Sequence, residues 1–432
     1  MILMLISMAL AGDTTTLSLR RALELAVERN PELQSAALGE SIAAIDARRA
    51  RLDRFSASIG GTAGGQAGFV KPWEQPAHDT SGASWDARAD LAVPLYAGGR
   101  IRASIELADA ASTLAGLDRA LAERTLLRAA YTAYWSIKGY ELQIAAGEEG
   151  LALTRESLAI IQAKADAGLA AGIDVNRSTV DVYAQEERLL SDRAQLYEAE
   201  QELIRLLHLS GDDVVLVDEP AAPAIGPADF PASGGASRPE LARTIQEAAA
   251  AEAGIRAAQA GALPTVTLSA TAGVGNTTAI ADPAASAFDP ANLGTGLDAS
   301  AGISVTWNPF DLFQTRDAVE QANLARKQVT LAREAEIDSI EQELRQARSA
   351  VTQLRARVPL VDAQESLARD NLRIVSELYA QGSASILDLF DAQAAFRQAR
   401  IQGASLRVAL ATAELDLRWV AGADLLAPGS TP

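Results

Sequence analysis

Four segments of the chain alternate between small or apolar residues and polar residues. In the first segment, Ala57, Ile59 and Phe69 share one face, while Ser58 and Thr62 fall on the other. A period of two is typical of β-strands, because successive side chains of a strand point to opposite faces of the sheet. The pattern therefore predicts two strands in each half of the chain, at 56–70 and 85–94, and at 264–275 and 297–307.

Long helical stretches follow each pair of predicted strands. Residues 100–166 contain no proline, and residues 314–380 contain one, Pro359, which interrupts an otherwise continuous helical pattern. At a rise of 1.5 Å per residue, a helix of this length spans roughly 100 Å. Each stretch then turns at a glycine and returns through 174–208 or 388–420. These lengths exceed a compact domain and predict two long helical hairpins.

The same order of elements occurs twice. One constant offset relates Gly168 to Gly382 and Asp174 to Asp388, and a helix opens each half, the first beginning at LSLRRALELAVERN. An internal repeat of this kind predicts one architecture used twice. We therefore expect a first repeat over 12–210, a proline- and alanine-rich connector at 211–237, a second repeat over 238–422 and a short tail at 423–432.

The predicted strands have the properties of membrane-spanning strands. A tilted strand needs about 9–11 residues to cross a bilayer, and each of these segments is long enough. Open strand edges are not tolerated in lipid, and four strands cannot close a barrel, so several copies must share one barrel. Aromatic residues at the strand ends are expected to form the interfacial girdles of such a barrel. They are Phe69, Trp85, Tyr96, Trp307 and Phe310.

The composition excludes several classes of function. Asp and Glu total 56 against 38 Lys and Arg, so the net charge of −18 argues against nucleic-acid binding, which needs a basic surface. The chain has no cysteine, and its two histidines, His78 and His208, are far apart, so no metal site is expected. No phosphate-binding loop of the Walker type occurs, and no cofactor is predicted.

The first residues, MILMLISMALAGD, form an apolar run that ends in an Ala-x-Ala pattern. This pattern is typical of the end of a secretory signal peptide, here without its basic start. We interpret residues 1–11 as a truncated signal peptide, and the alternative is a buried first helix.

Four stretches give the chain a resemblance to the TolC-like outer membrane efflux protein family. They are LSLRRALELAVERNPEL, LAVPLYAGGRIRASIELADA, VTWNPFDLFQTRDAVEQA and LYAQGSASILDLFDAQAAFRQAR. The resemblance implies a mixed α and β membrane protein, a homotrimer in which each chain contributes four strands to a twelve-stranded outer-membrane barrel. The helical hairpins would form an α-barrel that extends into the periplasm.

The implied function is that of a passive exit duct in a tripartite efflux or type I secretion system. The duct would be gated at its periplasmic tip, and its partners would be outer-membrane lipid, a periplasmic adaptor protein and an inner-membrane pump. The alternative is a non-pore trimeric helical scaffold or adhesin of the cell envelope, against which the four alternating segments speak.

The resemblance also gives expectations for the hairpin turns. Gly168 and Gly382 would be the tips at which an adaptor docks, although helix C-capping also explains a glycine at these positions. Asp174 and Tyr379 match members of a hydrogen-bonded latch between neighbouring hairpins, and the third latch position, often arginine, is Ala384 here. The alternative role of Tyr379 is that of a helix-packing aromatic.

Asp388 and Asp391 lie three residues apart and so share one face of a helix. A catalytic pair is not supported, because no histidine or nucleophile motif accompanies them, and the chain is not expected to be an enzyme. A capping box of Ser385 and Asp388 accounts for one carboxylate. The resemblance implies rings of aspartates at a closed pore entrance, where six carboxylates of a trimer would attract cations.

Overall fold

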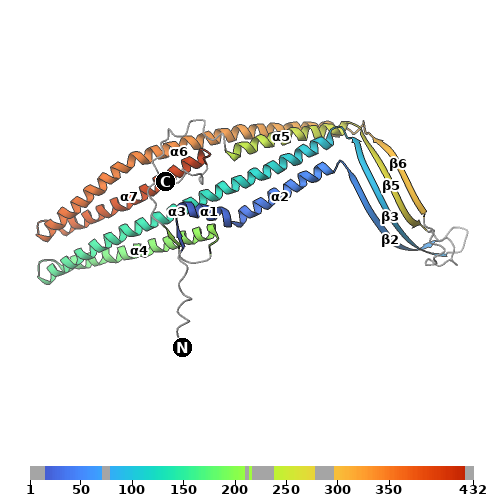
Figure 1. The fold of residues 1–432 in the computed structure, drawn as a ribbon. Helices are drawn as coiled ribbons and strands as arrows, with labels where there is room; N and C mark the ends of the chain where they lie inside the picture. The colour runs from blue at the N-terminus through green and yellow to red at the C-terminus, as the bar shows by residue number, and fades with distance from the viewer. Residues whose placement is uncertain (1–14, 71–77, 210–213, 217–237, 278–295, 424–432) are drawn as a thin grey trace, which may run out of the picture. The chain divides into compact units, whose positions relative to one another are not determined.

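The protein divides into two compact units, which are described separately. A helical unit comprises residues 1–37, 117–242 and 334–432, and a strand-bearing unit comprises 38–116 and 243–333. Both units therefore take residues from both halves of the repeat. The computed structural model (Figure 1) describes residues 15–70, 78–209, 214–216, 238–277 and 296–423. The predicted signal peptide, most of the connector and nearly all of the tail lie outside these residues.

Four antiparallel strands form one sheet in the order β2-β3-β5-β6. Leu91 of β3 lies between Ala57 of β2 and Ala270 of β5, and Ala270 lies opposite Ala301 of β6. The apolar faces of the four predicted segments therefore coincide on one side of the sheet, because a shared register keeps each alternation in phase. The strands run over Ser56–Val70, His78–Tyr96, Thr265–Thr277 and Gly296–Thr306. The second of these, β3, is longer at both ends than the predicted segment.

Two equivalent turns lead from the sheet into the long helices. Gly98 and Gly99 have φ angles of +60° and +88°, and at the equivalent positions of the second repeat Leu312 and Phe313 have φ angles of +54° and +70°. Glycine adopts this left-handed region without steric cost, whereas leucine and phenylalanine are strained there. The repeat thus preserves the backbone path of the turn even where the residues have changed.

Two helical hairpins, α3–α4 and α6–α7, build most of the helical unit (Figure 1). Each prediction of a long helix is confirmed, and α6 continues through Pro359, which the sequence had indicated as an interruption. Proline removes one backbone N–H, so the helix loses a hydrogen bond at this point without ending. The four helices are α3 at Arg100–Asp166, α4 at Gly172–Leu207, α6 at Gln314–Ala380 and α7 at Ile386–Val420.

The helix at the start of each repeat precedes the strands. In the first repeat, Asn30 divides it into α1 (Leu19–Arg29) and α2 (Pro31–Leu52). The side-chain oxygen of Asn30 accepts hydrogen bonds from the backbone N–H groups of Glu32 and Leu33, at 2.8 and 3.3 Å. Asparagine at the N-cap and proline at the first helical position are both favoured, so α2 begins here. The corresponding helix of the second repeat is α5 (Pro239–Gln259).

The core of the helical unit lies where α1 packs against α3 and α4. Leu17 also belongs to this core, within β1 (Thr15–Leu17), which pairs in parallel with β4 (Val214–Leu216). This small sheet lies partly in the expected connector and was not predicted. Each fully buried side chain of this size contributes about 1.5–3 kcal/mol. The largest members of the core are Leu23, Tyr131, Tyr134, Ile137, Leu203 and Leu207.

Within the described ranges, none of the helices is both long enough and apolar enough to span a membrane.

Candidate functional site

Both hairpins turn through the same backbone geometry. Gly168 follows α3 with a φ of +74°, and Gly382 follows α6 with a φ of +79°. In each turn, the amide after the glycine donates to the carbonyl four positions before the glycine, at 2.8 Å in both tips. This bond defines a Schellman motif, in which glycine is favoured because the left-handed conformation is costly for other residues. The two predicted tip glycines therefore occupy equivalent turns.

The second tip begins its returning helix with a complete capping box. The backbone N–H and the hydroxyl of Ser385 both donate to one carboxylate oxygen of Asp388, at 2.9 and 2.7 Å. The backbone N–H of Asp388 in turn donates to the Ser385 hydroxyl oxygen at 3.2 Å. These hydrogen bonds lower the pKa of Asp388, so its carboxylate stays ionised. The capping interpretation of Asp388 is confirmed, and its second carboxylate oxygen accepts none of these bonds.

The first tip has the same backbone but no side-chain cap. Its N-cap residue is Ala171, which makes no capping hydrogen bond, and Asp174 stands where the second tip has Asp388. The charge of Asp174 acts on Tyr379 of the other hairpin instead. Burial is the larger cause of the raised pKa of Tyr379, and the negative charge of Asp174 adds to it. The structure thus brings the two predicted latch residues within electrostatic reach, but among the described residues no hydrogen bond joins them.

Tyr379 is buried in an apolar cluster that both hairpins build. The Lys164 ammonium lies 4.1 Å from the centre of its ring and also donates to its backbone carbonyl. A cation over an aromatic face is attracted by the ring quadrupole, so Lys164 holds the tip of α3 to the end of α6. Ala384 packs partly against the same cluster and supplies no charge. The other buried members are Ile161, Leu372, Leu389, Ala392 and Phe396.

Lys164 was not singled out from the sequence. It stands in the last turn of α3, where a cation is favoured by the helix dipole, and its equivalent in the second repeat is Leu378. A comparison of the two repeats could have identified Lys164, because a charged residue at a position where the other repeat has an apolar residue indicates a specific contact. The burial of the Tyr379 ring agrees with the interpretation of this residue as a helix-packing aromatic. A role in a hydrogen-bonded latch would depend on its hydroxyl group.

Asp388 and Asp391 are both exposed near the start of α7. Within the part of the chain that the structure describes, Asp391 makes no hydrogen bond or ion pair. No group of three or more His, Asp or Glu side chains suited to a metal ion occurs among the described residues. The two carboxylates therefore present charge to solvent in a single copy of the chain.

Four of the five predicted interfacial aromatics lie at or beside a strand end, but Trp85 does not. Because β3 begins at His78 rather than near 85, Trp85 pairs with Ala63 inside the ladder of β2 and β3. Tyr96, Trp307 and Phe310 gather at the end where β3 stops and β5 begins, and all three are exposed. The Trp307 indole N–H donates to the carbonyl of Ala262 at 3.2 Å. The side chains of the other two aromatics, Phe69 and Trp85, lie outside the described part of the structure.

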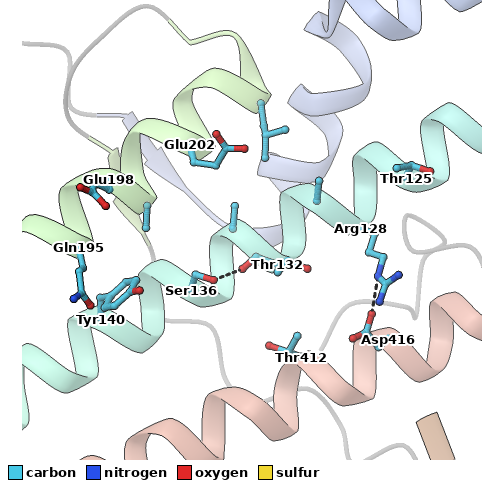
Figure 2. A pocket seen from close by; sticks show the side chains of 14 residues that line it. Thr125, Arg128, Thr132, Ser136, Tyr140, Gln195, Glu198, Glu202, Thr412 and Asp416 are labelled. Carbon is cyan, nitrogen blue, oxygen red and sulfur yellow. Dashed lines mark hydrogen bonds and ion pairs between the residues drawn. The ribbon is translucent and has the colours of Figure 1, made fainter. Parts of the chain in front are cut away.

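A hollow of about 790 Å³ opens on the helical unit, between α3, α4 and α7. Figure 2 shows the ion pair that crosses part of it, in which Arg128 Nε lies 3.0 Å from Asp416 Oδ1. The Tyr131 hydroxyl donates to the same carboxylate, which accounts for part of the raised pKa of Tyr131 after the larger effect of burial. Hydroxyl, amide and carboxylate groups line it in Figure 2 together with the apolar Ala129, Ala133, Ala199 and Leu206.

Comparison with known proteins identifies the family. The sequence profile of the outer membrane efflux protein family matches residues 22–208 and 235–423, once in each half of the chain. The chain belongs to this family. No curated protein sequence gave a significant match.

Solved structures of channels share the fold. The outer-membrane channel OprN superposes with a TM-score of 0.81 at 22% identity, over 95% of this chain and 91% of OprN. VceC of Vibrio cholerae gives a TM-score of 0.76 at 18% identity, over 94% of this chain and 96% of VceC. The open state of MtrE of Neisseria gonorrhoeae gives 0.73 at 20% identity, over 94% and 89% of the two chains.

Membership of the family confirms the resemblance noted in the sequence, including the mixed α and β fold with an internal repeat. Proteins of this family are passive efflux channels of the bacterial outer membrane that extend into the periplasm and work with an adaptor and an inner-membrane pump. The protein is accordingly an outer-membrane efflux protein and not an enzyme. The pore-free scaffold considered from the sequence is disfavoured by the same result.

Proposed function

We propose that three copies of the chain form an exit duct of a tripartite efflux or type I secretion assembly, gated at the hairpin tips. The observation that carries the proposal is the sheet, which has one apolar face, one hydroxyl-rich face and two outer strands, β2 and β6, that pair on one side only. Unpaired strand edges are not tolerated in lipid, so the sheet needs neighbours. Three sheets supply twelve strands, and the hydroxyl-rich faces would line the lumen.

The gate in this proposal consists of rings of carboxylates. Asp388 and Asp391 of three copies would place six negative charges around one axis. Like charges about 8 Å apart repel by about 0.5 kcal/mol per pair in water, and by more in a narrow throat. The capping box supports this role for Asp388, because it fixes the side chain and keeps the carboxylate ionised.

A latch between the two hairpins would keep the gate closed. Asp174 and Tyr379 are its predicted members, and the electrostatic effect of Asp174 on Tyr379 supports their pairing. Lys164 supplies a positive charge next to Tyr379, at a tip where Ala384 replaces the arginine that is frequent in the family. We include Lys164 in the latch for this reason.

The two units of the protein would meet different partners. At the tips, Gly168 and Gly382 expose short turns for an adaptor, and Leu169 and Leu387 are exposed apolar residues beside them. At the sheet, the exposed aromatics Tyr96, Trp307 and Phe310 are suited to the boundary between lipid and water, where such rings are enriched. The energy for export would come from the pump.

Single-channel recording in a planar bilayer tests the proposal. The wild-type protein is expected to give a small, cation-selective conductance, and Asp388→Asn/Asp391→Asn is expected to lose selectivity or to conduct more. Asp370→Asn, an exposed carboxylate elsewhere on α6, is the control and should leave both properties unchanged. No channel from folded, detergent-extracted protein would reject the duct, and an unchanged double variant would reject the carboxylate gate.

A further inference from the structure

A hollow of about 490 Å³ opens on the strand-bearing unit, where β3 passes into α3. Its volume is within the range of small-molecule sites, about 300–1,000 Å³. Its lining combines apolar side chains with charged ones, and a ligand that fills it must therefore satisfy both. The apolar lining includes Leu95, Tyr96, Ile101 and Ile105, and the charged lining comprises Arg54, Arg102 and Glu106.

A β-bulge makes this hollow continuous with the apolar face of the sheet. The ladder between β3 and β5 shifts after Pro94, so that Tyr96 pairs with Val266 and Leu95 is the extra residue. Residues directly opposite each other share a face, so the bulge turns Tyr96 to the apolar face to which Val266 belongs. Leu95 and Tyr96 are 56% and 47% exposed. The apolar face of the sheet therefore leads directly into the hollow.

Arg54 gives the hollow a positive charge that no carboxylate balances. Arg51, at the end of α2, forms an ion pair with Asp109 at 2.8 Å. The exposed side chain of Arg54 makes no hydrogen bond or ion pair with any residue that the structure describes. In a chain with 56 acidic and 38 basic residues, an unpaired guanidinium beside a hollow favours an anionic ligand.

The carboxylate of Glu106 does not cancel this charge, because two other arginines already balance it. Arg256 Nε donates to one of its oxygens at 3.1 Å, and Arg102 Nε donates to the other at 3.0 Å. These hydrogen bonds lower the pKa of Glu106, so its carboxylate stays ionised. The side chain of Arg102 is 86% exposed and so remains accessible to a ligand. Three arginines thus stand against one carboxylate at this hollow.

The equivalent place in the second repeat lacks the cation. Arg54 corresponds to Ala262, at the offset that aligns Pro31 with Pro239. The carbonyl of Ala262 accepts a hydrogen bond from the indole N–H of Trp307 at 3.2 Å. A neutral aromatic contact therefore replaces the guanidinium there, and the basic hollow is a feature of the first repeat.

We propose that this hollow binds an anionic phospholipid of the membrane leaflet that faces the periplasm. The lipid phosphate lies between Arg54 and Arg102, because guanidinium N–H groups match the oxygens of a phosphate. The acyl chains follow Leu95 and Tyr96 onto the apolar face of the sheet. The inference rests on the proposed function in placing that face against lipid, and it adds the binding site and the class of lipid.

Native mass spectrometry of the detergent-extracted protein with defined lipids tests the site. Phosphatidylglycerol is expected to bind, up to one molecule per chain, in preference to phosphatidylcholine, whose head group has the same phosphate but no net charge. Arg54→Gln is expected to weaken binding of phosphatidylglycerol about fivefold, and Arg54→Gln/Arg102→Gln about 25-fold, since each arginine contributes to that extent near an anionic lipid. Circular dichroism verifies that the variants are folded.

Arg316→Gln is the matched control. Arg316 is the repeat equivalent of Arg102 at the start of α6 and is exposed, but Ala262 stands where the first repeat has Arg54. This variant is expected to bind phosphatidylglycerol as the wild type does. Equal binding of the two lipids by the wild type, or an equal loss in Arg316→Gln and Arg54→Gln, overturns the inference. A trimer that binds neither lipid also overturns it, because a neighbouring copy then covers the hollow.

Inorganic phosphate distinguishes a lipid site from a simple anion site. It is not expected to displace phosphatidylglycerol, because it has no acyl chain to contact the apolar lining, and displacement would overturn the assignment to lipid. Planar-bilayer recording of the same preparation separates this inference from the proposed function. Channels from a wild type that shows no preference for phosphatidylglycerol overturn the lipid site and leave the duct intact. A preference that Arg54→Gln weakens, in a protein that gives no channel, supports the lipid site and overturns the duct.

Discussion

The first hairpin tip, residues 164–174, and the second, residues 378–388, follow the same backbone path but use their aspartates differently. Both tips have a left-handed glycine and the same Schellman hydrogen bond. The N-cap is Ala171 in the first tip and Ser385 in the second. One hydroxyl therefore decides whether the equivalent aspartate is bound into its own helix or acts on the neighbouring hairpin. Duplication preserved the turn, and one side chain gives the two aspartates different surroundings.

The largest effect that we expect concerns Tyr379, whose equivalent in the first tip is only Ala165. Replacing Tyr379 by Ala leaves a cavity in the buried tip cluster and removes the contact with Lys164, at a cost of about 3–5 kcal/mol. Tyr379→Phe keeps the ring and should cost less than about 1.5 kcal/mol, the upper range for one hydrogen bond. Denaturant unfolding followed by the helical circular dichroism signal measures both. Equal losses of stability in the two variants would contradict the conclusion that the ring, and not the hydroxyl, provides most of the packing.

The tip glycines should respond alike, because their backbone geometry is the same. Gly168→Ala and Gly382→Ala each force a side chain into the left-handed region, and each is expected to cost about 1–2 kcal/mol. Gly172→Ala is the control, since a Cβ there meets no atom within 4 Å and its φ is not positive. Unequal losses at the two tips in the same unfolding measurement would show that the turns are not equivalent.

Replacing the N-cap residue of one tip by that of the other tip should make the two tips more alike. Ser385→Ala is expected to destabilise the start of α7 by about 1 kcal/mol, and Ala171→Ser to stabilise the start of α4 by up to that amount. Ala171→Ser should also draw Asp174 into a capping box and lower the pKa of Tyr379, which the charge of Asp174 helps to raise. Ultraviolet titration of tyrosinate measures this shift. An unchanged titration would mean that Asp174 does not act on Tyr379.

A smaller effect concerns pH. The folded pKa of Asp388 lies below its ordinary value of 3.8, so the capping contribution is complete above that pH and is lost as pH falls through the folded pKa. Removing the hydroxyl in Ser385→Ala should raise this pKa towards the ordinary value. NMR titration of the Asp388 carboxyl measures the pKa in both proteins. A pKa that is unchanged in Ser385→Ala would contradict the capping account.

The fold could be predicted from the sequence because its signals are periodic and occur twice. The alternation around Leu91 and Ala270 defined strands that proved to share one register, and the two equivalent tip glycines marked both hairpin turns. The small β1–β4 sheet could not be predicted, because its strands are too short to show a period. The helix through Pro359 also differed from the prediction, since packing along a long hairpin offsets the loss of one hydrogen bond.

The site was predicted only in part. Ser385 and Asp388 form a local motif that the sequence displays directly. The contact of Lys164 with Tyr379 joins residues from different halves of the chain, and no spacing rule reports it. The effect of Asp174 on Tyr379 also required the structure, because the sequence shows only that the N-cap is Ala171 in one tip and Ser385 in the other.

The separation of roles between the two tips is tested most directly by single-channel conductance of Asp174→Asn and Asp388→Asn, recorded side by side. If Asp174 holds the latch and Asp388 lines the entrance, Asp174→Asn will increase the conductance and keep its cation selectivity. Asp388→Asn will reduce the selectivity with a smaller change in conductance. Identical behaviour of the two variants, or a silent Asp174→Asn, would contradict the division of roles between the two aspartates.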